Sequence, residues 1–165
     1  MLLGEFNEAD RPVAVSALRP CLDVPRWVDQ IADRRPFSSL EDLLDFASRA
    51  ASPLTSREVE SALAHHPRIG DRATGTSSEA ELSRGEQAAL GEGSDAVNAA
   101  LAEGNRSYEE KFGRVFLIRA AGRSKQDILE ALQARISHSA AEEEPIVQQQ
   151  LREIAVQRLQ GLMSQ

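Results

Sequence analysis

Two of the three histidines in the 165-residue chain stand side by side, in the stretch "LAHHPRIGD" at residues 63–71. Helical spacing from the apolar positions before them places His66 on the inward face and His65 on another face. Because Pro67 disfavours helical geometry at the residue before it, the helix is predicted to end at His66. A histidine titrates near neutral pH, so His66 could exchange a proton at the edge of a core. The alternative is a partly buried histidine that is simply hydrogen-bonded to a carbonyl.

Two further charged side chains fall on predicted apolar faces. Glu86 lies at helical spacing from Leu82 and Leu90. It also stands three residues after Ser83, so a capping box between the two is an alternative. Arg158 continues an apolar stripe of the last predicted helix, where it either extends outward to solvent or meets a buried anion. Together with the histidine, these residues indicate one polar pocket suited to proton transfer near a bound anion.

The same residues do not favour other kinds of site. Adjacent histidines diverge, and neither Cys21 nor His138 stands at a ligand-like spacing from them, so we expect no metal site. The stretch around Ser83 lacks the pattern of a nucleophile elbow, which argues against a serine triad. His138 is predicted to be an exposed loop residue.

The elements that must position these side chains are predicted to be helices. Apolar residues recur every three to four positions along nearly the whole chain. The short apolar run 115–118 could be strand or buried helix, and residues 71–80 are predicted to be a loop. The pattern therefore predicts an all-α fold, a compact single-domain bundle of about eight helices over 1–165. The predicted helices cover 10–20, 24–34, 38–47, 55–66, 83–90, 94–112, 124–136 and 140–163.

Residues typical of helix ends support these boundaries. Ser38 and Thr55 each precede a glutamate by three residues, the spacing of a capping box. Val13 and Trp27 are placed on the inward sides of their helices. Gly113 is predicted to end the long helix that begins at Ser94.

Composition and charge exclude several classes of function. The net charge of −7 at pH 7 argues against binding to nucleic acids and to anionic membranes. No apolar run approaches the ~18 residues of a membrane span, and the acidic N-terminal stretch does not resemble a signal peptide. The single cysteine, Cys21, cannot form an internal disulfide, which fits a cytoplasmic protein.

Six ordered segments resemble the family of 2-oxo-4-hydroxy-4-carboxy-5-ureidoimidazoline (OHCU) decarboxylases. They span nearly the whole chain, and "HPRIG" followed by "SxxEQ" and "NxxYxxxFG" is a specific combination. The resemblance implies an all-α fold and the loss of CO₂ from OHCU to give (S)-allantoin, the last step of urate degradation, without metal or organic cofactor. The segments are "WVDQIADRRPF" (27–37), "HPRIG" (66–70), "SRGEQAAL" (83–90), "NRSYEEKFGRVFLIRAAGRS" (105–124), "ALQARI" (131–136) and "EIAVQRL" (153–159).

The resemblance also implies roles for individual residues. His66 matches the catalytic histidine of the family, which we expect to donate the proton, and Glu86 matches the catalytic glutamate, which we expect to orient the substrate. Val115 stands where many members have proline, a departure that concerns the rim of the pocket. The substrate-binding residues that the resemblance implies are Pro67, Ser83, Arg84, Gly85, Gln87, Phe116, Leu117, Ile118, Arg119, Ala120 and Arg158.

The partners follow from the same resemblance. It implies OHCU as the small-molecule substrate, uricase and 5-hydroxyisourate hydrolase as pathway neighbours, and it admits a homodimer. Two alternatives stay open. One is a helical ligand-binding or interaction module whose inward polar residues are satisfied core groups. The other is a related ureide- or purine-pathway lyase with an altered substrate, which the Val115 departure keeps open.

Overall fold

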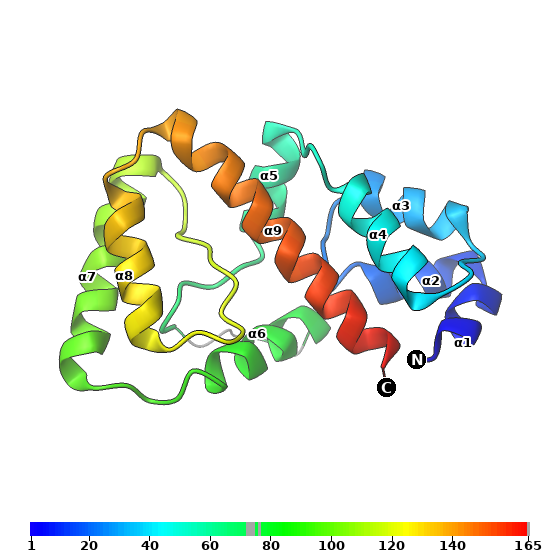
Figure 1. The fold of residues 1–165 in the computed structure, drawn as a ribbon, viewed down its shortest axis with the longest axis horizontal. Helices are drawn as coiled ribbons and strands as arrows, with labels where there is room; N and C mark the ends of the chain where they lie inside the picture. The colour runs from blue at the N-terminus through cyan, green and yellow to red at the C-terminus, as the bar shows by residue number, and fades with distance from the viewer. Residues whose placement is uncertain (72–74, 76, 165) are drawn as a thin grey trace. The chain divides into compact units, whose positions relative to one another are not determined.

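The chain folds almost entirely into helices, as the hydrophobic pattern predicts (Figure 1). The computed structural model describes residues 1–71, 75 and 77–164; residues 72–74 and 76, part of the predicted loop, lie outside it. Over the described part of the chain there are nine helices and no strand, so the all-α prediction is confirmed with one more helix, α1, than predicted. The helices are α1 (Leu3–Glu8), α2 (Arg11–Leu18), α3 (Pro25–Arg34), α4 (Leu40–Ala50), α5 (Ser56–Leu63), α6 (Ser78–Ala88), α7 (Asp95–Phe112), α8 (Lys125–Ile136) and α9 (Ala140–Met163).

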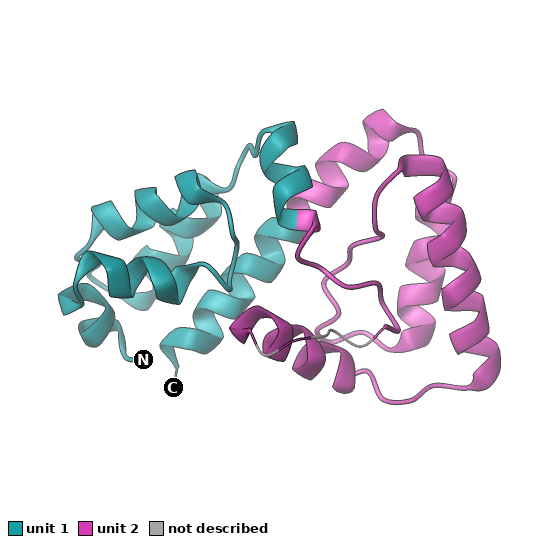
Figure 2. Cartoon of the chain, turned by 180° about the vertical axis from the view of Figure 1, so that it is seen from behind, with its two compact units in different colours: residues 1–62, 151–165 teal, residues 63–150 magenta. Residues whose placement is uncertain are grey.

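The helices belong to two compact units (Figure 2). Unit 1 comprises residues 1–62 and 151–165, and unit 2 comprises residues 63–150. The long helix α9 gives its first part to unit 2 and its remainder to unit 1. The prediction of a single domain over the whole chain stays a prediction.

In unit 1, the apolar face of α3 packs against α4. Trp27, Val28 and Ile31, which define that face, are all buried. The indole Nε1 of Trp27 donates a hydrogen bond of 2.9 Å to the carbonyl of Ala47 on α4, so the buried ring leaves no polar atom unsatisfied. One apolar prediction is wrong, since Val13 on α2 is 51% exposed.

In unit 2, α7 and α8 lie side by side (Figure 1). They approach closely at Gly104, where a Cβ atom would lie 2.5 Å from Cδ2 of the buried Leu132. The apolar cluster between them also includes Ile69, from the loop after α5, and Ile118, from the irregular segment 115–120. Two non-helical stretches are therefore anchored in the same core as the helices.

Local capping residues set several helix ends. The N–H of Glu58 donates to Oγ1 of Thr55 at 3.1 Å and the N–H of Thr55 donates to the Glu58 carboxylate at 2.9 Å, which confirms that capping box. The box predicted from Ser38 is wrong by one residue, because Ser39 accepts the N–H of Asp42 at 3.1 Å.

Helix α6 begins five residues earlier than predicted. Ser77 caps it, with Oγ accepting the N–H of Ala80 at 3.1 Å. The capping box between Ser83 and Glu86 is therefore wrong, since both residues lie inside the helix. Ser83 is 3% exposed and Ala80 is 9% exposed, whereas Leu82 is 37% exposed, so the predicted apolar stripe through Leu82 is also wrong.

Candidate active site

His66 lies in a turn just beyond the end of α5. The helix ends at Leu63, three residues before its predicted end, and the N–H of His66 donates to the Leu63 carbonyl at 3.1 Å. His66 and Pro67 are half-buried, whereas His65 is exposed. The turn, rather than the continued face of a helix, positions the His66 ring.

Gln87 on α6 holds the loop that follows His66. Its Oε1 accepts the N–H of Gly70 at 2.9 Å and its Nε2 donates to the carbonyl of Arg68 at 3.1 Å. The predicted substrate-binding amide is thus engaged with the protein backbone in this structure. The contact joins the loop of His66 to the part of α6 that carries Glu86.

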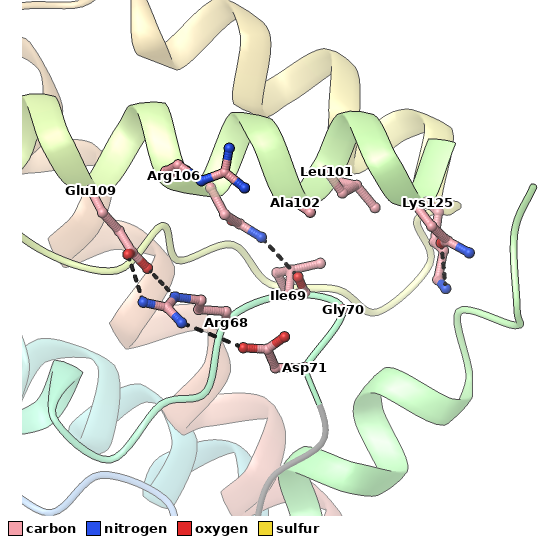
Figure 3. A pocket seen from close by; sticks show the side chains of 11 residues that line it. Arg68, Ile69, Gly70, Asp71, Leu101, Ala102, Arg106, Glu109 and Lys125 are labelled. Atoms are coloured by element: carbon pink, nitrogen blue, oxygen red, sulfur yellow. Dashed lines mark hydrogen bonds and ion pairs between the residues drawn. The ribbon is translucent and has the colours of Figure 1, made fainter. Parts of the chain in front are cut away.

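Helix α7 fixes the same loop from a second element. Nδ2 of Asn105 donates to the Ile69 carbonyl at 2.9 Å. The guanidinium of Arg68 points toward the Glu109 carboxylate, with one N–O distance of 2.9 Å, and toward Asp71 (Figure 3). The hydrogen bonds to Glu109 raise the pKa of Arg68 above its ordinary value.

A cavity of about 480 Å³ opens beside this loop (Figure 3). Its walls carry charges of both signs, and its cations already have partners: Arg68 has Glu109, and Nζ of Lys125 donates to a backbone carbonyl at 2.7 Å. Neither His66 nor Glu86 lines this cavity. It is therefore not the space in which the predicted catalytic pair would meet a substrate.

The predicted substrate-binding stretch of α6 is only partly accessible. Ser83 is buried, Arg84 and Glu86 are half-buried and Gly85 is exposed. Nη1 of Arg84 donates to the carbonyl of Gly75 at 2.8 Å. Because Glu86 lies inside the helix, capping no longer explains its position.

The apolar run 115–118 is neither strand nor helix but part of an irregular connection between α7 and α8. The carbonyl of Leu117 accepts a hydrogen bond of 2.7 Å from Nη1 of Arg135, and the N–H of Arg119 donates to Oε1 of Gln150 at 2.8 Å. Side chains from α8 and α9 therefore hold the backbone of this segment. Among its predicted site residues, Phe116, Leu117 and Ile118 are buried, and Arg119 and Ala120 are half-buried.

Arg158 belongs to unit 1 and is 5% exposed. Its Nη1 donates to the carbonyl of Pro20 at 3.0 Å. The interpretation in which this side chain extends to solvent is therefore wrong. Its assignment to substrate binding stays a prediction.

Residues 7–160 match the family model described as OHCU decarboxylase. The chain belongs to the OHCU decarboxylase family. It is 28% identical over 145 residues to a 2-oxo-4-hydroxy-4-carboxy-5-ureidoimidazoline decarboxylase of Haloferax volcanii. The matched region covers 87% of this chain and 84% of that relative. It is 30% identical over 156 residues, 92% of this chain, to the uric acid degradation bifunctional protein PucL of Bacillus subtilis, of whose length it spans 30%.

A solved structure supports the fold. A crystal structure of OHCU decarboxylase in the presence of (S)-allantoin superposes with a TM-score of 0.76, covering 91% of this chain and 99% of that one at 24% identity. The all-α architecture of this OHCU decarboxylase family member is thus shared with a relative of distant sequence.

A buried ionic network in unit 2 was missed by the sequence analysis. Glu143 on α9 is fully buried, and its carboxylate accepts hydrogen bonds from Nε of Arg135 at 2.8 Å and from the hydroxyl of Tyr108 at 2.6 Å. Nδ1 of His138 lies 3.0 Å from the other carboxylate oxygen. The prediction that His138 is exposed is therefore wrong, since this contact leaves the ring half-buried.

The network shifts the ionisation of its members. Burial by itself would raise the pKa of Glu143, but hydrogen bonds from Arg135, Tyr108 and His138 outweigh it and hold that pKa below its ordinary value. Burial, together with the bond to Glu143, raises the pKa of Tyr108. Glu143 lies four residues before Val147, on the stripe that contains Arg158, so helical spacing could have found it.

The described residues form neither a metal-binding cluster nor a membrane-spanning helix. Within them, no three His, Cys, Asp or Glu side chains are placed to hold a metal ion. None of the described helices is long and apolar enough to cross a membrane. The expectation of a reaction without metal or organic cofactor stays a prediction.

Proposed function

We propose that this protein removes CO₂ from OHCU and releases (S)-allantoin, with His66 as the proton donor and Glu86 orienting the substrate. The observation that carries the proposal is the clamp of Gln87 on Arg68 and Gly70. It joins the two segments that hold the histidine and glutamate of the family motifs. Membership of the family and the names of the relatives support the same reaction.

The chemistry needs a proton delivered to one face of the substrate. By its name, OHCU carries a carboxylate and a hydroxyl on ring carbon 4, next to carbon 5, which bears the ureido group and an imidazoline double bond. Breaking the bond to the carboxylate releases CO₂, and its electron pair forms a double bond between carbons 4 and 5. The pair of the imidazoline double bond moves onto the ring nitrogen, which takes up a proton, and this leaves an enol. Protonation of carbon 5 on one face, with loss of the hydroxyl proton, gives one enantiomer of allantoin. A half-buried histidine can supply that proton near neutral pH.

The remaining predicted residues would bind and orient the substrate. Glu86 would accept a hydrogen bond from the substrate hydroxyl, and backbone groups near Ile118 would bond the ring amides. Arg158 would pair with an anionic oxygen. Since tight pairing with the departing carboxylate would stabilise the ground state, Arg158 is expected to position the substrate rather than accelerate the loss of CO₂.

The wider setting is part of the same proposal. OHCU would be supplied by oxidation of urate and hydrolysis of 5-hydroxyisourate, the reactions of uricase and 5-hydroxyisourate hydrolase. The single cysteine supports a cytoplasmic location. A homodimer is proposed on the family resemblance.

The decisive experiment is a coupled assay. OHCU is generated from urate with uricase and 5-hydroxyisourate hydrolase, and the circular dichroism of (S)-allantoin is followed with and without this protein. We expect rapid appearance of the signal with the wild type and a loss of at least about 100-fold in kcat with His66→Asn, because general acid catalysis contributes that much or more.

The neighbouring histidine provides the matched control. His65→Asn changes an exposed ring one residue away and should leave turnover unchanged. Near-normal kcat in His66→Asn would overturn the assignment of the proton donor. Slow, racemic allantoin with the wild type would overturn the reaction itself and favour a ligand-binding module, which a rise in melting temperature with xanthine or allantoin would then support.

A further inference from the structure

The irregular segment 115–120 needs outside partners for its backbone. Helices satisfy their own N–H and C=O groups, whereas an extended segment with no neighbouring strand does not. Here the groups flanking Ile118 find partners on side chains: the Leu117 carbonyl on Arg135 at 2.7 Å and the Arg119 N–H on Gln150 at 2.8 Å. The backbone on each side of Ile118 is thus fixed by one hydrogen bond.

We call these two side chains, Arg135 and Gln150, the anchors of the segment. The first anchor, Arg135, is an ionised side chain held inside the core. It is 6% exposed, and its guanidinium carbon lies 4.5 Å from the centre of the Phe116 ring. Glu143 compensates its charge, with Oε1 2.7 Å from Nη2, and leaves Nη1 to bond the Leu117 carbonyl. Burying an ion pair costs desolvation free energy, so stability alone does not explain why a buried arginine bonds the Leu117 carbonyl.

The second anchor, Gln150, comes from the same helix as Glu143, seven residues further along α9. It is 9% exposed, and its Oε1 accepts the Arg119 N–H. Both anchors therefore depend on α9. Arg135 lies in the segment 131–136 of the family resemblance, whereas Gln150 lies in none of the six segments.

The two anchors determine how Ile118 is presented. The peptide bonds on either side of Ile118 are trans, so in each of these two peptide groups the C=O and the N–H point in opposite directions. With the Leu117 carbonyl and Arg119 N–H directed to their anchors, the N–H and C=O of Ile118 itself point the other way. Ile118 is 5% exposed, and no described residue bonds its N–H or C=O. A buried donor and acceptor on one residue match the adjacent C=O and N–H of a ureide ring.

We propose that Arg135 and Gln150 are positioning residues for substrate binding: they orient the peptide units around Ile118 so that its N–H and C=O receive the ureide ring. This inference rests on the proposed function. The bonds to the ring would form equally in the substrate and in the transition state. Loosening the segment should therefore raise KM and leave kcat nearly unchanged.

The test uses the full chain with three variants. Gln150→Met keeps the side-chain length and removes the acceptor, and Gln150→Glu keeps an acceptor oxygen. Tyr108→Phe removes a bond to Glu143 but keeps the ring that packs against Phe116 of the segment. Amide hydrogen exchange of Arg119 is measured without ligand, and kcat and KM are measured in the coupled assay. For Gln150→Met we expect Arg119 exchange to quicken at least about tenfold and KM to rise about tenfold, the weight of one net hydrogen bond.

The controls separate positioning from general destabilisation. Gln150→Glu should keep KM within about threefold of wild type, and so should Tyr108→Phe, although the latter also loses a buried bond. Faster Arg119 exchange with unchanged KM in Gln150→Met would overturn the positioning role, as would an equal rise of KM in Tyr108→Phe. If Gln150→Met does not fold, Gln150→Asn, whose acceptor is one methylene short, replaces it with the same criteria. Absence of decarboxylation by the wild type would instead overturn the proposed function.

Discussion

The two units of the molecule bury different kinds of side chain. In unit 1 the core is apolar, formed by residues such as Trp27, Ile31 and Leu43, and Arg158 is the charged residue buried there. The other five buried polar or charged residues of the described chain all belong to unit 2. They are Ser83, Asn105, Arg135, Glu143 and Gln150.

The difference follows from the amount of irregular backbone. Unit 2 contains the loop after α5 and the segment 115–120, whose N–H and C=O groups cannot be satisfied within a helix. Asn105 and Gln150 each bond such a backbone group, and Arg135 bonds another. The arrangement has a cost: Oδ1 of Asn105 is buried and has no hydrogen-bond partner among the described residues. Candidate site segments are thus found where polar residues are buried to hold irregular backbone.

The largest test of this comparison removes the buried carboxylate of unit 2. Glu143→Leu should lower the free energy of unfolding by about 3–5 kcal/mol, because Arg135 is left as an uncompensated buried charge. The double variant Glu143→Leu/Arg135→Met should recover at least half of that loss, since an apolar pair can replace a buried ion pair. Denaturant unfolding at neutral pH measures both. A double variant as unstable as the single one would show that the charge pair is not the cause.

A smaller effect is expected from titrating the same carboxylate. The fold lowers the pKa of Glu143 below its ordinary 4.5, so the unfolded chain takes up its proton first as the pH falls. The stabilisation from Glu143 is therefore complete above the ordinary pKa of 4.5, and it is lost as the pH falls through the lower pKa of the folded protein. Glu143→Gln should flatten the fall in unfolding free energy below about pH 5, which denaturant unfolding at a series of pH values measures.

Unit 1 offers the matched carboxylate for this pH experiment. The pKa of Glu58 is also lowered: burial alone would raise it, but bonds from Arg26 and from the Thr55 N–H outweigh that effect. Its side chain is 15% exposed, against 0% for Glu143. Glu58→Gln should flatten the fall in unfolding free energy at low pH less than Glu143→Gln does. The reverse order would contradict the contrast between the units.

The smallest predicted effects have opposite signs in the two units. Gly104→Ala would place a Cβ 2.5 Å from the buried Leu132 and should destabilise the protein by about 1–2 kcal/mol through overpacking. Gly161→Ala on the unit 1 part of α9 meets nothing within 4 Å and should stabilise it by about 0.5–1 kcal/mol through helix propensity. Thermal unfolding of both variants checks the signs; stabilisation by Gly104→Ala would mean that α7 and α8 are less tightly packed than they are here.

The sequence by itself determined the features that depend on near neighbours in the chain. Apolar spacing predicted the helices, Thr55 and Glu58 form the predicted cap, and Gly113 ends α7 with a φ of +70°. These features depend on residues within about one helical turn, so a single stretch contains all the information. The ordered motifs likewise identified the family, since they are properties of the chain order alone.

Tertiary structure decided which polar residues meet. Spacing placed Glu86 on an apolar stripe that does not exist, because α6 is capped by Ser77 rather than by Ser83 and buries Ala80 and Ser83 instead of Leu82. It gave no sign that Arg135 on α8 and Glu143 on α9 form a buried pair, or that Arg135 holds an irregular segment. Such contacts depend on how whole helices pack, and a polar residue is buried only when a distant partner satisfies it. That partner is supplied by the folded chain, and the local pattern around either residue does not name it.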